Sequence, residues 1–451
     1  MEYFKLEKPG KTYDIFEINA ELQKLDHPNI IPTLADATTS PKYLYWDKVK
    51  YKTRPKEFTP ELFWSIVKLL RSLSPSRTAT SVLDMSGKYY YWQRLPRFEE
   101  FAHQVDMNLG GRLESHIPDS PAEKQRYITI GIMEEAIASS QLEGANTERK
   151  YAKRMLQENR KARNKYDQMI INNYRAMKQI EESLRDREMS AELLLELHAT
   201  LTKDTLDVKD IGRFRKASDD IVVDDPSTHV IFHEAPPVNF LKKELKRLVD
   251  YANDKLTPKV FEHPVFKAIV LHFWIAYLHP FVDGNGRVAR ALFYWYMLRK
   301  GYWAISYLPI SRVIKQSPAQ YRDAYIYSEQ DDCDLTYFID YNVAKIQQAR
   351  REFDSYVKRK QSEQKALVQL TVGQYGFNDR QIQLLRYLEK NLKGTTSIAA
   401  HAEIYNVTRM TARRDLEQLE RLGFLTSHKL GRTRPFSATD KLNELFKSTR
   451  S

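Results

Sequence analysis

Twelve consecutive residues, from His279 to Arg290, combine side chains that could bind and transfer a phosphate group: His-Pro-Phe-Val-Asp-Gly-Asn-Gly-Arg-Val-Ala-Arg. Gly284, Asn285 and Gly286 tolerate positive φ angles, so their loop can turn its amide groups inward around an anion. The run from Val288 to Leu298 contains no Gly or Pro and predicts a helix, whose free N-terminal amides attract phosphate. The segment therefore predicts a nucleotide phosphate site.

Four titratable or charged side chains of this segment have distinct chemical uses. Arg287 and Arg290 lie three residues apart, so both can project from one side of the first helical turn and clamp phosphate oxygens. Asp283 can hold Mg²⁺ against those oxygens, and an imidazole such as that of His279 suits a general base at neutral pH. The alternative is a helical corner in which the glycines only turn the chain and the arginines are solvated.

The spacing differs from the Walker A pattern, which needs Lys and Ser or Thr after the second glycine, and from the three spaced glycines of the Rossmann pattern. It resembles the signature of the Fic family (filamentation induced by cAMP), His-x-Phe-x-Asp/Glu-Gly-Asn-Gly-Arg-x-x-Arg, and every fixed position is filled here. The resemblance implies a protein adenylyltransferase, which moves AMP from ATP to a hydroxyl of a target protein. A few relatives move other phosphate-linked groups, so the donor stays open.

The resemblance also implies a role for each residue of the motif. His279 would take the proton from the attacking Ser, Thr or Tyr hydroxyl, and Asp283 would hold Mg²⁺ between the α- and β-phosphates of ATP. The remaining roles would be a phosphate cradle (Gly284, Asn285, Gly286), contacts to the β-phosphate (Arg287) and γ-phosphate (Arg290), and an inward packing anchor (Phe281). Further on, Tyr321 resembles a tyrosine that lines the nucleotide pocket, although a tyrosine in so aromatic a chain is more often a core residue.

A second motif, Ser139 to Gly144, resembles the inhibitory sequence of Fic proteins, Ser/Thr-x-x-x-Glu-Gly/Asn, in the class II arrangement that precedes the catalytic motif. The resemblance implies that Glu143 pairs with Arg290 and withholds it from the γ-phosphate. Ser139 lies one helical turn before Glu143, so its hydroxyl could orient the carboxylate. Two alternatives stay open: a solvated helix end, and a hydrolase in which Glu143 directs water at AMP-modified protein.

Residues 221–233 predict a hairpin. Two short β-branched runs, residues 221–223 and 229–233, flank the turn residues 224–228, which read Asp-Asp-Pro-Ser-Thr. In Fic proteins a flap at this position clamps the target by strand addition, so the resemblance implies target docking at residues 221–233. A surface hairpin without a partner is the alternative.

The C-terminal segment resembles a winged helix-turn-helix. Helices are predicted from Asn378 to Glu389, from Ser397 to Tyr405 and from about Thr408 to Leu422, followed by a wing from Leu425 to Ser437 that turns at Gly431. Between Arg409 and Arg434 there are seven Lys and Arg residues against three acidic ones, and Arg409, Arg413 and Arg414 are the predicted DNA contacts. Such domains also dock proteins. A rival function is therefore a transcription regulator whose Fic pocket senses a nucleotide.

Composition bounds the remaining possibilities. The chain has 451 residues, a net charge of +12 and 42% hydrophobic residues, which is typical of a folded protein with several domains. The single cysteine, Cys333, cannot form an internal disulfide, and the first residues lack a signal-peptide core, so we expect a cytoplasmic location. Lys267, His272 and His279 interrupt the apolar stretch from Val265 to Val282, which favours a buried helix over a membrane span.

The N-terminal region is the least informative. Residues 42–49 and 88–95 echo each other in Lys, Tyr and Trp, which predicts two related strands in a small domain; aromatic side chains that stack on bases are the alternative. Residues 17–25 and 60–73 have helical spacing. This region resembles the N-terminal extension of longer Fic proteins.

We therefore expect a mainly α fold with three parts. Residues 1–120 form an N-terminal Fic-associated domain, residues 121–360 a Fic helical bundle with its inhibitory helix and β-hairpin flap, and residues 376–445 the winged helix-turn-helix. Residues 358–365 either link the last two parts or form a solvated helix face. Homodimers are common in the family, and the sequence leaves the oligomeric state open.

Overall fold

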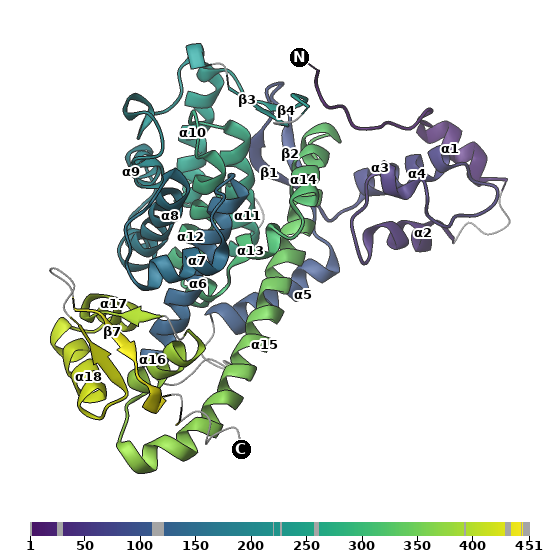
Figure 1. Cartoon of the computed structure of the whole chain (residues 1–451). Coiled ribbons are helices and arrows are strands. Elements are labelled where there is room, and N and C mark those ends of the chain that lie inside the picture. Colours follow the sequence, from purple (N-terminus) through teal and green to yellow (C-terminus); the bar gives the residue numbers. More distant parts are fainter. Residues whose placement is uncertain are drawn as a thin grey trace.

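The structure is a computed structural model that describes residues 2–24, 30–110, 121–219, 221–225, 228–256, 261–391, 394–428, 434–442 and 444. It is mainly α-helical, as predicted, with small sheets (Figure 1). One hydrophobic core joins the N-terminal region to the helical bundle, and a second, separate core belongs to the C-terminal part.

Two buried helices form the centre of the bundle, α11 (Pro264–Leu278) and α12 (Asn285–Arg299). Pro264 occupies the first turn of α11, where its missing N–H costs no hydrogen bond, and nearly every side chain of both helices is buried. A helix that is apolar on all sides must be surrounded by protein, which confirms the buried helix predicted for residues 265–282. Within the described residues no helix is long and apolar enough to cross a membrane.

The helices that surround this pair belong to the same compact bundle (Figure 1). They are α6 (Pro121–Leu142), α7 (Arg149–Gln157), α8 (Lys165–Glu182), α9 (Ala191–Thr202), α10 (Val238–Ala252), α13 (Ile310–Ile314), α14 (Pro318–Gln330) and α15 (Thr336–Tyr375). Helix α15 is continuous through residues 358–365, so this stretch is helical and also leads from the bundle to the C-terminal domain. The side chains of residues 360–374 lie outside the described part of the chain.

The N-terminal region packs against the bundle. Its elements are α1 (Ile15–Leu22), α2 (Ile30–Thr39), α3 (Trp46–Val49), α4 (Pro60–Leu73), β1 (Arg77–Leu83), β2 (Tyr89–Gln93) and α5 (Pro96–Val105). The helix over residues 60–73 and the strand within residues 88–95 are confirmed. Of the helix expected over 17–25, α1 contains residues 17–22, and residues 23–24 form a turn. The strand expected over residues 42–49 is wrong, since the chain there enters α3. Neighbouring Tyr45 and Trp46 are both buried, whereas a strand would turn them to opposite faces.

The predicted hairpin is present. Strands β3 (Val222–Asp224) and β4 (Ile231–Glu234) pair in antiparallel register, with Val223 opposite His233. Two of its predicted turn residues, Pro226 and Ser227, lie outside the described residues.

The C-terminal domain has the predicted winged-helix order: α16 (Asp379–Lys390), β5 (Thr395–Thr396), α17 (Ile398–Tyr405), α18 (Arg409–Arg421), β6 (Leu425–Ser427) and β7 (Phe436–Ala438). The helix starts follow from side-chain caps, because Asn378, Ser397 and Thr408 each accept a backbone N–H of the first turn. Strand β5, which the sequence analysis missed, joins β7 and β6 in a three-stranded sheet. Lys429, Gly431 and Arg432 of the predicted wing lie outside the described residues.

Gly131, in the middle of α6, sets how closely this helix approaches its neighbours. A Cβ atom at this position would lie 2.2 Å from the Ser306 carbonyl oxygen and 2.9 Å from the Tyr307 Cα. Ala favours helix over Gly by about 1 kcal/mol, so propensity alone predicts that Gly131→Ala stabilises the protein. We expect the opposite, a loss of about 1–3 kcal/mol in the free energy of unfolding, because backbone atoms must move to admit the methyl group.

Denaturant unfolding measures this difference. Gly10→Ala is the matched control, since nothing lies within 4 Å of a Cβ at Gly10. An increase in stability for Gly131→Ala would contradict the close approach of α6.

Candidate functional site

The motif from His279 to Arg290 forms the loop between α11 and α12 and the first turns of α12. His279 ends α11 in the left-handed conformation, with φ 45° and ψ 59°. Gly284, with φ 86°, precedes the first residue of α12, a position where a side chain would be strained. The helix begins at Asn285, three residues before the predicted Val288, so Arg287 and Arg290 both lie on α12 near its N-terminus.

Asn285 closes the loop upon itself. Its side-chain oxygen accepts the Phe281 N–H and its amide donates to the Phe281 carbonyl, both at 2.9 Å. The Asn285 side chain is buried, so its role in the structure is to hold the loop, and a phosphate could meet only the backbone there. Phe281 is fully buried and packs inward, as the sequence analysis expected.

His198 on α9, which the sequence analysis missed, supports the same loop. Its ring stacks on Phe281 with centroids 4.0 Å apart and planes 2° apart. Its Nδ1 accepts the Gly212 N–H at 3.0 Å, which leaves Nε2 to donate to the Asp283 carbonyl at 2.9 Å. Burial lowers the pKa of His198 to about 4, because protonation would put a charge in a dry site and oppose the bond from Gly212.

His279 presents one free ring nitrogen. Its Nδ1 lies 3.3 Å from the Ala276 carbonyl and must carry the proton to donate there, so Nε2 is left as an acceptor. Burial, together with the neighbouring charge of His233, lowers the pKa of His279 to about 3. Arg215 donates to the His279 carbonyl at 2.7 Å and steadies the end of α11. The arrangement offers a neutral imidazole that can accept a proton.

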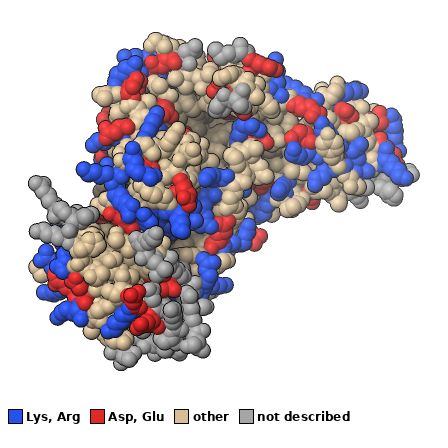
Figure 2. Space-filling view, viewed as in Figure 1, with Lys and Arg blue, Asp and Glu red and all other residues tan. Residues whose placement is uncertain are grey.

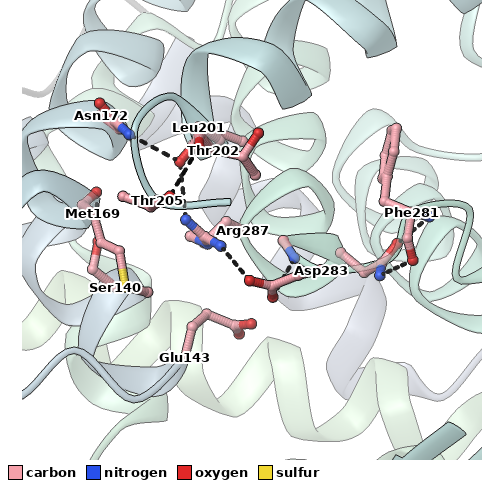
Figure 3. Close-up of polar contacts among 12 residues, drawn as sticks. Ser140, Glu143, Met169, Asn172, Leu201, Thr202, Thr205, Phe281, Asp283 and Arg287 are labelled. Atoms are coloured by element: carbon pink, nitrogen blue, oxygen red, sulfur yellow. Dashed lines mark hydrogen bonds and ion pairs between the residues drawn. The ribbon is translucent and has the colours of Figure 1, made fainter. Parts of the chain in front are cut away.

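Asp283 and Arg287 form a pair at the start of α12 (Figure 3). Arg287 is 1% exposed and donates to the Leu201 carbonyl at 2.9 Å, and its Nη2 lies 3.5 Å from the Asp283 carboxylate. Arg287 therefore points into the protein. The spacing had predicted that Arg287 and Arg290 project from one side of the helix toward a phosphate, and for Arg287 this prediction is wrong. The Asp283 side chain is 49% exposed and receives the Gly284 N–H at 2.6 Å.

Arg290 is buried and held by the end of α6. It donates from Nε to the Ser139 hydroxyl at 2.8 Å and from Nη2 to the Ser139 carbonyl and a Glu143 carboxylate oxygen, both at 3.0 Å. The structure thus contains the predicted contact between Glu143 and Arg290. The expectation that Ser139 orients the Glu143 carboxylate is wrong: among the described residues the Ser139 hydroxyl bonds Arg290 and makes no hydrogen bond to Glu143.

The Glu143 carboxylate also fills the space above Gly286. A Cβ on Gly286 would lie 2.3 Å from a Glu143 oxygen, so only glycine admits the carboxylate here. The carboxylate lies beside the N-terminal turn of α12, where the helix dipole favours negative charge. Gly144, two residues after the end of α6, adopts φ 87° and turns the chain away from the site directly after Glu143.

Tyr321 on α14 lies in an aromatic cluster close to Arg290. Its hydroxyl lies 2.7 Å from Nε2 of His272 and 3.2 Å from the Tyr325 hydroxyl, and its ring contacts Tyr325 and Tyr341. Burial, with the nearby Arg290, lowers the pKa of His272 to about 3. Both the pocket and the core interpretation of Tyr321 are compatible with this position.

The donor set fits a magnesium ion that is shared with phosphates. Among the described residues, no group of three His, Cys, Asp or Glu side chains could hold a metal. Asp283, half exposed beside the loop, is the carboxylate available to a cation. Mg²⁺ suits such a site, because it usually keeps several waters and binds one or two carboxylates together with substrate phosphates.

Two stretches of the chain match models of known protein families. Residues 188–297 match the model of the Fic/DOC family, and residues 380–434 match that of a DeoR-like helix-turn-helix domain. The first match includes residues 279–290 but not residues 139–144.

Two curated relatives cover a similar part of the chain. Protein adenylyltransferase fic-1 of Caenorhabditis elegans is 32% identical over 117 residues, 26% of this chain and 20% of that protein. Protein adenylyltransferase Fic of Drosophila willistoni is 31% identical over 128 residues, 28% of this chain and 23% of that protein. The match therefore spans less than a quarter of either relative. A solved Fic family protein from Desulfovibrio desulfuricans G20 aligns with a TM-score of 0.48 and 18% identity, over 76% of this chain and 96% of that chain.

The neutral form of His198 makes the stability of the bundle depend on pH. Its pKa falls from the ordinary 6.5 to about 4 in the folded protein, so the unfolded chain binds the proton more tightly. The stabilisation is therefore present above pH 6.5 and is lost as the pH falls from 6.5 toward 4, by about 3 kcal/mol at most.

Unfolding midpoints measured between pH 4 and 7 test this dependence. His198→Gln is expected to be less stable at pH 7 and to lose less stability on acidification than the unmodified protein. His103→Gln, at an exposed position on α5, is the matched control for the substitution itself and should be as stable as the unmodified protein at pH 7. An unchanged slope for His198→Gln would show that His198 is not held neutral.

Proposed function

We propose that this chain, which carries a Fic domain followed by a DeoR-like helix-turn-helix domain, is a protein adenylyltransferase that moves AMP from Mg-ATP to a Ser, Thr or Tyr hydroxyl. The observation that carries the proposal is that an acceptor nitrogen on His279 is followed, six residues later, by the start of a helix whose N-terminal amides can bind an anion. The naming of two relatives as protein adenylyltransferases supports it at the level of the Fic domain.

The chemistry needs one proton transfer and one exchange of bonds at phosphorus. The target hydroxyl oxygen forms a bond to the α-phosphorus, its proton passes to Nε2 of His279, and the bond from the α-phosphorus to the departing pyrophosphate breaks. Asp283 would hold Mg²⁺, which neutralises phosphate charge when bound. The N-terminal amides of α12 and Arg290 would bind the phosphates, and Arg287 would position the loop through Leu201 and Asp283.

We propose further that the chain is autoinhibited. The Glu143 carboxylate accepts a hydrogen bond from Arg290 and fills the space above Gly286. A phosphate of the nucleotide would need the same hydrogen-bond donor and the same space. A carboxylate and a phosphate cannot share them, because their negative charges repel each other at close range. Release of Glu143 would make Arg290 available to the γ-phosphate.

Glu143→Gly tests inhibition and activity together. Removing the carboxylate should raise transfer of label from [α-³²P]ATP, to the chain itself or to proteins in a lysate, by about tenfold or more, since a charge-assisted hydrogen bond to Arg290 is worth about 1.5–3 kcal/mol. His279→Ala on that background should lower transfer by a factor of about 10²–10⁴.

Glu148→Gly is the matched control, because Glu148 is exposed and makes no side-chain capping bond at the start of α7. Equal labelling by Glu143→Gly and Glu148→Gly would reject autoinhibition. Labelling that survives His279→Ala would reject the proposed base.

A second candidate function is a DNA-binding protein whose Fic pocket senses a nucleotide. The observation that favours it is the position of the C-terminal domain, which packs on α6, the helix that ends at the inhibitory motif. Ile404 of α17 accepts a hydrogen bond from Thr129 of α6, at 3.5 Å, and Lys178 of α8 pairs with Glu403. The same helix therefore contacts both the site and the candidate DNA-binding domain.

The face that would meet DNA is open. Arg409, Arg413 and Arg414 of α18 are exposed, and none of them has an ion pair within the described part of the chain. Asp415, by contrast, is buried and binds Arg380, Asn378 and His401, so it fastens the three helices together and does not offset those arginines. Figure 2 shows further basic side chains gathered over α7, beside the C-terminal domain.

Thermodynamic coupling between the binding of ATP and the binding of DNA tests this second candidate. If α6 couples the two sites, Mg-ATP should change the dissociation constant of a random-sequence 30-bp duplex by about fivefold or more, and the duplex should change that of ATP by the same factor. Fluorescence anisotropy and calorimetry measure the two constants, and the affinity for DNA should fall with salt with a slope of about −0.9 per phosphate contacted. Arg413→Ala should weaken DNA binding, whereas Arg421→Ala, at the other end of α18, is the control. Failure to bind the duplex at low salt would reject this candidate.

A further inference from the structure

The first described residues of the chain add a third strand to the flap. The Ile231 N–H donates to the Glu2 carbonyl and the Phe4 N–H donates to the Ile231 carbonyl, both at 2.8 Å, so Tyr3 pairs with Ile231 in parallel register. The Tyr3 hydroxyl donates to the Glu234 carboxylate at 3.0 Å. One edge of β4 is therefore bonded to β3 and the other to residues 2–4, which lie beside β4 in Figure 1.

Helix α14 holds the opposite edge of this segment. The Gln330 amide accepts the Leu6 N–H and donates to the Phe4 carbonyl, both at 2.9 Å, as a neighbouring strand would. Beyond it, the Glu7 carbonyl accepts from the Tyr45 hydroxyl at 2.9 Å. We call residues 2–7 the arm. It is an extended segment whose backbone is hydrogen-bonded to the backbone of β4 on one side and to the side chains of Gln330 and Tyr45 elsewhere.

The arm alternates between inward and outward side chains. Phe4 packs on Phe232 of β4, with ring centroids 5.6 Å apart, and Leu6 is 9% exposed in the main core. Tyr3, Lys5 and Glu7 are exposed. The groove between β4 and α14 thus accepts an extended peptide with apolar side chains at two alternate positions, which is the pattern of strand addition.

This groove borders the candidate site. On β4, the ring of His233 lies 6.2 Å from the ring of His279 and its Nε2 lies 2.8 Å from the Tyr277 carbonyl. On α14, Glu329 lies 2.8 Å from Nδ1 of His233, and Tyr321 lies on the same helix. A peptide paired with β4 would therefore run past the end of α11, where His279 could receive a proton.

We propose that the arm occupies the edge of β4 as an intramolecular stand-in for the extended segment of a target. The inference rests on the proposed transferase function and names its substrate class: an extended segment with two apolar side chains at alternate positions, in the manner of Phe4 and Leu6. A target must displace the arm, so the arm is a competitor that is tethered at high effective concentration.

Peptide binding tests the docking edge without relying on activity. A variant that lacks residues 2–8 is mixed with a fluorescent peptide of the same sequence, Glu-Tyr-Phe-Lys-Leu-Glu-Lys, and anisotropy is followed. The shortened chain should bind the peptide about tenfold or more tightly than the full chain, in which the tethered arm competes. The same peptide with Asp in place of Phe and Leu should not bind.

A second pair of variants keeps the arm and covers the case in which the shortened chain does not fold. Phe4→Asp should loosen the arm and admit the peptide, whereas Lys5→Asp places the same acidic side chain at an exposed position and should behave as the unmodified chain. Equal peptide binding by Phe4→Asp and Lys5→Asp would overturn the proposal. Uptake of the peptide by the full chain with the same affinity would place the docking edge elsewhere, on the outer edge of β3.

Transfer on the Glu143→Gly background separates this inference from the proposed function. Phe4→Asp should raise labelling of lysate proteins about tenfold relative to Lys5→Asp. If Glu143→Gly produces no label while the peptide still binds only to arm-displaced variants, the transferase proposal fails and β4 remains a peptide-docking edge. If label appears and neither arm variant changes peptide binding or labelling, the docking edge is wrong and the transferase stands.

Discussion

The buried guanidinium of Arg290 is the constraint on which the site depends. A charge this deeply buried needs hydrogen-bonding and ionic partners, and losing one of them costs several kcal/mol. In this structure Ser139 and Glu143 supply those partners from a helix about 150 residues earlier in the chain. If Glu143 moves away, Arg290 needs another anion as its partner. We therefore expect the carboxylate to leave and a phosphate to bind in the same step.

The position of Glu143 relative to Arg290 depends on the position of α6. Contacts along the length of α6 hold this helix in place. Gly131 permits direct contact with the backbone at Ser306. One turn later, Glu135 accepts the Ser311 N–H and the Tyr294 hydroxyl, and burial raises the pKa of this carboxyl. Glu134 faces the other way and pairs with Arg149 and Lys153 of α7. Because these contacts tie α6 to α7, α12 and α13, movement of Glu143 need not carry the whole helix with it.

Sequence analysis identified what depends on local order. The loop at residues 279–290, the hairpin, the helix starts at Asn378, Ser397 and Thr408, and the buried α11 all follow from turn residues, caps and hydrophobic runs. It missed what depends on partners distant in sequence. His198 supports Asp283 from 85 residues away, and the arm reaches β4 across more than 220 residues. Residues 46–49 form α3, beside which Tyr45 packs on aromatic side chains of α4 and α14. No local pattern carries such information.

The residues of the motif from His279 to Arg290 fall into two groups, structural and chemical, and the spacing in the sequence did not distinguish them. Within one motif, Phe281, Asn285 and Arg287 are buried and bind backbone or core. His279 is only partly exposed but keeps a ring nitrogen as an acceptor, and Asp283 has a half-exposed carboxylate. Both groups are required at fixed spacing. The buried residues are needed because a glycine-rich loop does not hold one conformation by itself, and His279 and Asp283 are needed because their side chains would take part in the chemistry. Arg290 belongs to both groups. Its ion pair with Glu143 helps to compensate its buried charge, and the same ion pair must be replaced when a nucleotide phosphate binds.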